Sequence, residues 1–334
     1  MRERNGLLDF FKGIFAICIV FVHFPFPGAI GKIVASIGVV GVIFFFLISG
    51  YWSYDESGTN AYKLIVRFKR NLILTIVAVG IYFLFTVVEQ NMLGTFDEWF
   101  LAFKNPVTYI RMIVLGDFQL IHADQLWFMP ALLYGYLILY VMEKKRLHKL
   151  FYTLLPALLL LRICMETYTN SFSNISWLDW HFSGNFLVGA LPVMVLGNFM
   201  HRHIEDLKAI HLKTAVFGGV VSILLVFLFV NIKVGMLDIS QVFKIAAAAF
   251  AFMICIAYNK KVYSGIICRF GEKYTLYMYL YHYLIGTWIS DLFLHFSLPQ
   301  YAFHYILPFA ALIVSAVVSA AIYNIKFIKH KQRA

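Results

Sequence analysis

The amino-acid sequence predicts an all-α, polytopic integral membrane protein with about ten transmembrane helices and both termini in the cytoplasm. Three observations lead to this prediction. Apolar residues make up 61% of the 334 residues and charged residues only 13%, roughly half the charged fraction of a soluble domain. The apolar residues gather in runs of about 20, the length that crosses a bilayer as a helix. The lysines and arginines concentrate in alternate connections between these runs.

The predicted spans follow one another with short polar connections. They cover residues 7–26, 33–53, 71–88, 124–142, 147–165, 184–200, 213–231, 240–258, 274–293 and 302–325. Residues 89–123 contain only a weak apolar piece, Tyr109 to Leu115, for which we expect a re-entrant or interfacial helix. No repeat or Pro/Gly-rich linker divides the chain. We therefore expect residues 1–334 to form a single membrane domain with no fused soluble domain.

The distribution of positive charge sets the expected orientation. One set of connections, including both ends of the chain, holds 22 of the 28 Lys and Arg residues, and such loops face the cytoplasm. The formal charge of +11 thus reflects topology and not a nucleic-acid surface, so we expect no nucleic-acid partner. The expected location is the cytoplasmic (plasma) membrane, with the lipid bilayer as the surroundings of the spans.

The first predicted span carries three ionisable residues, and each has a cost in hydrocarbon. Lys12 and His23 are eleven residues apart, so they project from one helix face, separated by about 16 Å along the axis. Asp9 lies one turn before Lys12 and can pair with it. A lysine that extends to the interface and a hydrogen-bonded structural histidine would also explain the pattern.

Polar residues mark later spans as well. His282 falls near the middle of the ninth span among hydroxyl-bearing neighbours such as Tyr279; a packing histidine bonded to a tyrosine is the simpler alternative. Ser49, with Gly50, gives the second span a small face that lets another helix or a ligand come close. Trp127 begins the fourth span, where an aromatic anchor at the interface is the plain alternative.

Two arginines stand one helical turn apart where the second inner connection enters the third span. The positive-inside rule explains charge at this place. The spacing of Arg67 and Arg70 also suits two guanidinium groups that grip phosphate. The four cysteines form no CxxC pair, so we expect no metal site and no bound cofactor.

Taken in order, these features resemble acyltransferase family 3, which includes bacterial O-acetylases of sugars and polysaccharides. The matching segments are Leu8-Asp9-x-x-Lys12-Gly13 with His23, Phe45-Phe46-Leu47-Ile48-Ser49-Gly50-Tyr51, Arg67-x-x-Arg70, Leu126-Trp127-Phe128 and Gly271-x-x-x-Thr275-x-x-x-Tyr279-Leu280-x-His282. The sequence departs from the family pattern at Lys12, where arginine is usual, and at Thr275, where serine is usual. The esterase-like domain fused to some relatives is not expected here.

The resemblance implies transfer of an acyl group, usually acetyl, from cytoplasmic acyl-CoA to a hydroxyl of a cell-surface or lipid-linked sugar or polysaccharide. Acyl-CoA is then a co-substrate, and the sugar is the second partner. Lys12, Arg67 and Arg70 are the expected donor-binding residues. Ser49, Trp127 and Tyr279 are expected to line the acceptor cavity.

His23 is the expected catalytic residue, either as the general base that deprotonates the acceptor hydroxyl or as a transient acyl carrier. Asp9 is expected to orient Lys12, and His282 to bind the acceptor or steady the developing oxyanion. A transporter or exporter of a polysaccharide or a small anion is the competing function, because intramembrane His and Lys also suit proton-coupled transport.

Overall fold

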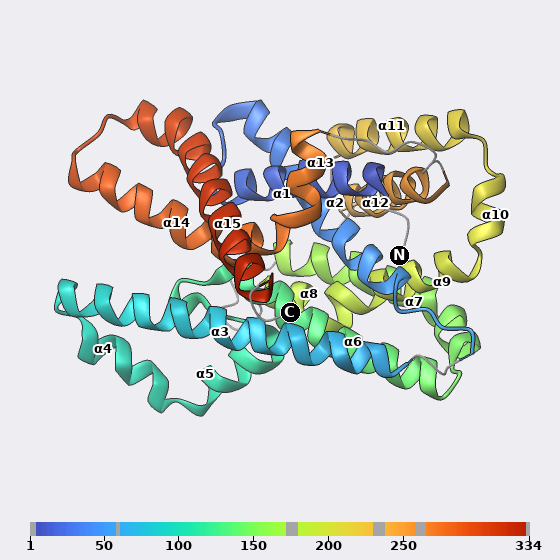
Figure 1. The fold of residues 1–334 in the computed structure, drawn as a ribbon, viewed down its shortest axis with the longest axis horizontal. Coiled ribbons are helices and arrows are strands. Elements are labelled where there is room, and N and C mark those ends of the chain that lie inside the picture. The colour runs from blue at the N-terminus through green and yellow to red at the C-terminus, as the bar shows by residue number, and fades with distance from the viewer. Residues whose placement is uncertain (1–4, 58–60, 172–179, 230–237, 258–264, 332–334) are drawn as a thin grey trace. The chain divides into compact units, whose positions relative to one another are not determined.

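A computed structural model describes residues 5–57, 61–171, 180–229, 238–257 and 265–331 of the chain (Figure 1). These residues are almost entirely helical and include no β-strand. Within them, eight helices are long and apolar enough to cross a membrane. The eight are Gly6–His23, Gly28–Tyr51, Tyr62–Leu93, Asp124–Lys144, His148–Thr169, Leu212–Phe229, Ser240–Ala257 and Ala302–Ile325. The prediction of an all-α polytopic membrane protein is confirmed.

The other two predicted spans are helical but less suited to crossing. Phe186–Arg202 is a shorter apolar helix. Helix α14 (Thr275–His295) has 21 residues, but its tyrosines and histidines make it less apolar than the eight. Residues 89–93 are the end of helix α3 (Tyr62–Leu93), and residues 94–123 form only short helices, α4 (Phe96–Leu101), η1 (Ala102–Lys104), α5 (Pro106–Ile110), η2 (Arg111–Leu115) and η3 (Gln119–Ile121). This agrees with the expectation that no span lies there.

The chain forms two compact units whose boundaries fall inside helices α2 (Gly28–Tyr51), α10 (Ile204–Ala209), α11 (Leu212–Phe229) and α12 (Ser240–Ala257). Unit 1 takes the described residues of Met1–Phe45, Leu207–Phe227 and Lys244–Ala334. Unit 2 takes those of Phe46–Asp206 and Leu228–Phe243. The candidate site residues are accordingly divided between two units, each of which is described by itself.

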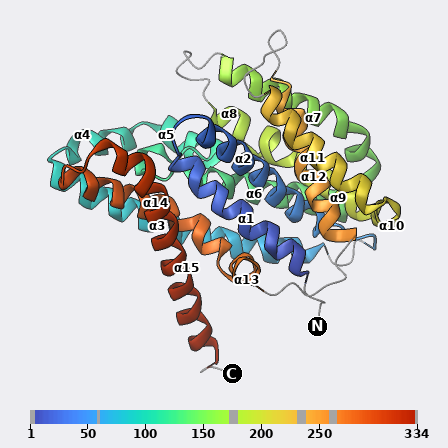
Figure 2. The ribbon, with the colours of Figure 1, turned by 90° about the horizontal axis from the view of Figure 1, so that it is seen from above.

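Unit 1 is centred on the first helix and the C-terminal helices. Its other elements are α1 (Gly6–His23), α13 (Ile266–Lys273), α14, η6 (Ala302–Ile306) and α15 (Leu307–Lys331). Helices α14 and α15 pack side by side, and α1 contacts both (Figure 2). Val20, Phe24, Met278, Leu307 and Ala311 form a buried cluster where the three helices meet.

Helix α1 ends at His23, three residues before the predicted end of the span. Pro25 and Pro27 follow directly. Proline lacks the amide proton of the helical ladder, and it disfavours helical geometry in the residue before it. Phe24 accordingly leaves the helix, with φ −123° and ψ 75°. His23 therefore lies at the very end of a helix and not inside one.

Two glycines bring the backbones of α1 and α13 into contact. A Cβ added at Gly271 would overlap the carbonyl oxygen of Asp9, and one added at Gly13 would meet the carbonyl oxygen of Ile267. Small residues are what allow such close approach of helices in membranes. Because α14 begins two residues after α13 ends, this contact also fixes where α14 starts relative to α1.

Unit 2 consists of the remaining helices. Besides α4, η1, α5, η2 and η3 it contains α3 (Tyr62–Leu93), η4 (Asp124–Trp127), α6 (Phe128–Lys144), α7 (His148–Ser171), α8 (His181–Gly184), η5 (Phe186–Ala190), α9 (Leu191–Arg202) and the first half of α10 (Ile204–Ala209). The end of α2 crosses α9 closely: a Cβ at Gly50 would overlap the backbone of Met194, and one at Gly197 the carbonyl oxygen of Leu47. The small face expected at Ser49 and Gly50 thus admits another helix.

We predict that Gly271→Ala destabilises unit 1. The added methyl group must displace the Asp9 carbonyl, which is backbone and cannot rotate away, so the free energy of unfolding should fall by roughly 1–3 kcal/mol. Gly265→Ala is the matched control, because Gly265 has extended backbone with φ −179° and, among the described residues, no atom within 4 Å of an added Cβ. Thermal unfolding in detergent measures both variants. Equal midpoints for the two would contradict the prediction.

Candidate functional site

Unit 1 brings His23 and His282 together. The centroids of the two imidazole rings are 5.2 Å apart, and the Tyr283 ring lies 5.2 Å from His23 in an edge-on arrangement. His23 is the last residue of α1, and His282 lies within α14. Two residues that are 259 positions apart in sequence therefore form one histidine pair. From the sequence they were predicted only as two separate site residues.

The hydrogen bonds of His282 determine its tautomer. Nδ1 lies 2.9 Å from the carbonyl oxygen of Met278 and 3.0 Å from that of Tyr279. Carbonyl oxygens only accept hydrogen bonds, so we assign the proton to Nδ1, which leaves a lone pair on Nε2 of the neutral ring. His282 is fully buried, and among the described residues Nε2 has no hydrogen-bond partner. An unpaired buried acceptor costs about 1–3 kcal/mol.

Asp9 and Lys12 form the pair that the sequence predicted. Lys12 Nζ donates to Asp9 Oδ1 at 3.0 Å, with Asp9 largely buried and Lys12 partly exposed. Asp9 lies fourteen residues before His23 on the same helix, about 21 Å along its axis. Asp9 therefore acts on Lys12 and does not touch the histidine pair.

Two tyrosines flank the pair in different ways. Tyr279 contributes its backbone carbonyl to the bond with His282. Tyr283 places its ring against His23, a contact that sequence reasoning missed. The only indication in the sequence was the position of Tyr283 directly after His282 in a tyrosine-rich helix. Neighbouring side chains on a helix point about 100° apart, so this position did not predict a contact with His23.

The two arginines of unit 2 lie on the first turns of α3 and differ in their surroundings. Arg67 is half-buried, and its Nη1 donates to the carbonyl oxygen of Trp52 at 2.8 Å. Arg70, one turn later, is exposed. Arg67 is thus held by the segment that follows α2, whereas Arg70 presents its guanidinium outward.

Ser49 and Trp127 also belong to unit 2. The Trp127 ring lies 6.2 Å from that of Phe46 and 6.0 Å from that of Trp180, measured between centroids. Phe46 and Ser49 are three residues apart on α2, so they are neighbours on its surface. Trp127 therefore packs beside the part of α2 that carries Ser49, within an aromatic group, and is more than an isolated interfacial anchor.

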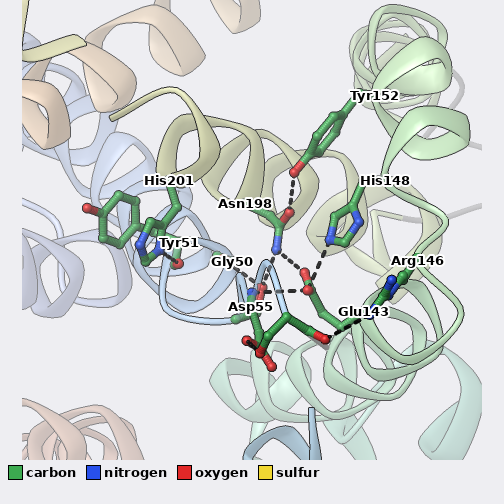
Figure 3. A network of polar contacts seen from close by, with 11 residues as sticks. Gly50, Tyr51, Asp55, Glu143, Arg146, His148, Tyr152, Asn198 and His201 are labelled. Carbon is green, nitrogen blue, oxygen red and sulfur yellow. Dashed lines mark hydrogen bonds and ion pairs between the residues drawn. The ribbon is translucent and has the colours of Figure 1, made fainter. Parts of the chain in front are cut away.

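Unit 2 also contains a polar network that sequence reasoning missed (Figure 3). Glu143, fully buried at the end of α6, accepts from the backbone N–H of Asp55 at 3.0 Å and from Asn198 Nδ2 at 2.7 Å, and contacts His148 Nε2 at 3.0 Å. Tyr152 donates to Asn198 Oδ1 at 2.6 Å. In the sequence Glu143 lies next to a run of positively charged residues, so it looks like an ordinary charged residue of a loop. Asn198, an amide inside an apolar run, was the one visible signal.

The comparisons with known proteins identify the family of the chain. The sequence profile described as an acyltransferase domain, that of acyltransferase family 3, matches residues 5–325, nearly the whole chain. No curated protein and no solved structure gives a significant match. The match favours an enzyme over the transporter considered from the sequence. The chain belongs to acyltransferase family 3 and is a multi-pass membrane acyltransferase.

Proposed function

We propose that the protein transfers an acyl group, acetyl in the first instance, from cytoplasmic acyl-CoA to a hydroxyl of a cell-surface or lipid-linked sugar. The observation that carries this proposal is the histidine pair. An acyltransferase needs a group that takes a proton from the acceptor hydroxyl, and unit 1 gathers two imidazoles in one place. In this proposal the connections rich in Lys and Arg, which include both termini, face the cytoplasm, where acyl-CoA is found.

In the proposed reaction His23 is the general base. It takes the proton from the sugar hydroxyl as the oxygen attacks the thioester carbonyl. The new C–O bond forms, the C–S bond breaks, and the departing CoA thiolate receives the proton from the imidazolium. Base catalysis of this kind contributes roughly 10²–10⁴-fold to the rate.

His282 is proposed to receive a hydrogen bond from the acceptor. With the proton on Nδ1, Nε2 can accept from a hydroxyl but cannot donate to an oxyanion. This supports the role of acceptor binding over that of oxyanion stabilisation, and it gives the unpaired buried nitrogen a partner during catalysis.

The second route is covalent. His23 would attack the thioester, release the thiolate and form an acyl-imidazole, which the sugar hydroxyl then attacks to regenerate His23. Rapid mixing with radiolabelled acetyl-CoA, without acceptor, separates the two routes. Label bound to the wild-type protein and lost in a His23 variant supports the covalent route; no bound label supports direct transfer.

Lys12, Arg67 and Arg70 are proposed to bind the phosphates of the CoA donor. Lys12 belongs to unit 1 and the arginines to unit 2, and the assignment rests on charge and on the family pattern. Ser49, Trp127 and Tyr279 are proposed to line the acceptor cavity. An aromatic side chain such as Trp127 offers a flat apolar face, and the hydroxyl groups of Ser49 and Tyr279 offer hydrogen bonds.

We predict that His23→Ala lowers acetyl transfer by at least about 10²-fold while the unfolding temperature in detergent stays close to that of the wild type. His295→Ala is the matched control, because His295 is exposed at the far end of α14 and should leave activity unchanged. Transfer of radiolabelled acetyl to an acceptor sugar measures both. Near-normal turnover by His23→Ala would remove His23 from the mechanism.

We predict that His282→Asn lowers transfer without unfolding the protein. The asparagine amide can keep a donor close to the Met278 and Tyr279 carbonyls, whereas the acceptor at Nε2 is lost. The loss should appear mainly as a higher KM for the sugar, with the KM for acetyl-CoA unchanged. An unaltered KM for the sugar would contradict the assigned role.

We predict that Arg67→Ala and Arg70→Ala weaken acetyl-CoA binding, and that the loss shrinks as salt is raised, because screening weakens exposed charge interactions. Lys69→Ala is the control: it removes one exposed positive charge from the opposite side of the same helix. Isothermal titration with acetyl-CoA gives the affinities. Equal affinity in all three variants and the wild type would show that the arginines serve only as topology signals.

A further inference from the structure

We propose that Glu143 is a positioning residue for the donor: it holds the segment Trp52–Asp55 in place, and that segment orients the guanidinium of Arg67. The inference rests on the donor-binding role proposed for Arg67. It concerns unit 2 alone, and its residues lie apart in sequence, on α2 and its following segment, α3, α6, α7 and α9. Figure 3 shows the network around Glu143.

The partners of Glu143 match a carboxylate. A backbone N–H and an amide NH2 can only donate hydrogen bonds, and they reach Oε2 and Oε1 respectively. His148 Nε2 lies 3.0 Å from Oε2 and donates a third hydrogen bond in the tautomer that carries its proton on Nε2. A fully buried carboxyl group is costly unless it is hydrogen-bonded. Three convergent groups supply that compensation, so the side chain is a fixed anchor.

The anchored segment is held at two points. Asp55 is bonded to Glu143 through its backbone N–H. Ser53 accepts from Asn198 Nδ2 at 2.9 Å through its hydroxyl oxygen, and that hydroxyl in turn donates to the carbonyl of Gly50. Asn198 itself is bonded to Glu143, so both points depend on the same carboxylate.

Trp52 precedes these two points directly, and its carbonyl oxygen accepts from Arg67. The direction of that carbonyl is set by the backbone on either side of it. On one side α2 ends at Tyr51; on the other Ser53 and Asp55 are fixed by the network. Release of Glu143 would free the Ser53–Asp55 side and, through Trp52, the orientation of Arg67.

The same geometry would also arise if the network served stability alone. Breaking it would then lower the unfolding temperature, and any loss of donor affinity would be independent of Arg67. A positioning role makes a different claim: the effect of Glu143 on donor binding must pass through Arg67. Coupling between two residues is measured by a double-mutant cycle.

The experiment uses the full-length protein in detergent and acetyl-CoA as the probe. Glu143→Gln keeps the size of the side chain but replaces one acceptor oxygen by an NH2 group that meets only donors. Isothermal titration should show affinity roughly tenfold weaker for Glu143→Gln. The double variant with Arg67→Ala should bind as Arg67→Ala does. Glu56→Gln, which removes an exposed carboxylate directly after that segment, should bind as the wild type does.

Tyr152→Phe is the milder second variant, for use if Glu143→Gln fails to fold. It removes only the hydroxyl that donates to Asn198, and its smaller loss of affinity should likewise vanish in the Arg67→Ala background. Unchanged affinity in Glu143→Gln or Tyr152→Phe, or losses that multiply with that of Arg67→Ala, would overturn the inference. If Arg67→Ala itself binds as the wild type does, the donor role proposed for Arg67 fails and the inference falls with it.

Discussion

The backbone contact between α1 and α13 is the constraint on which the arrangement of the histidine pair depends. Gly13 and Gly271 let two helices from opposite ends of the sequence meet without side chains between them. Helix α14 starts directly beyond this contact, so its register against α1 is set there. His282 lies beside His23 because α1 and α14 both extend from this contact. The apolar cluster around Val20 and Met278 packs the two helices together between the contact and the histidines.

This arrangement places two imidazoles in an apolar environment, and among the residues that the structure describes neither ring is paired with a carboxylate. In many enzymes a carboxylate fixes the tautomer of a catalytic histidine. In this protein the helix itself does so for His282, through the carbonyl oxygens of Met278 and Tyr279. No negative charge is needed for that purpose, which suits a site surrounded by hydrocarbon, where every additional charge is costly.

Much of the fold follows from the sequence, because hydropathy and the placement of Lys and Arg respond to the bilayer, which acts on each helix separately. The pairing of Asp9 with Lys12 was predictable for a similar reason: both residues lie on one helix, whose period is known. The end of α1 was misplaced by three residues, although Pro25 and Pro27 already indicated it.

The remaining parts of the candidate site depend on contacts between distant segments. The approach of Tyr283 to His23, and the convergence of Asp55, Glu143 and Asn198, join residues far apart in the chain. No local pattern encodes which helix a given side chain will meet. The family resemblance pointed to His282 as a site residue, which helix periodicity could not do. Neither the resemblance nor the periodicity pointed to Glu143.

Helix α3 has 32 residues and is therefore about 48 Å long, whereas the hydrocarbon layer is about 30 Å thick. We expect the charged start of α3, which carries Arg67 and Arg70, to extend into the layer of lipid headgroups. Anionic phospholipids offer the same phosphate chemistry to these guanidinium groups as a nucleotide does. Anionic lipid headgroups would therefore compete with the proposed donor for Arg67 and Arg70, so that donor affinity would depend on the composition of the surrounding lipid.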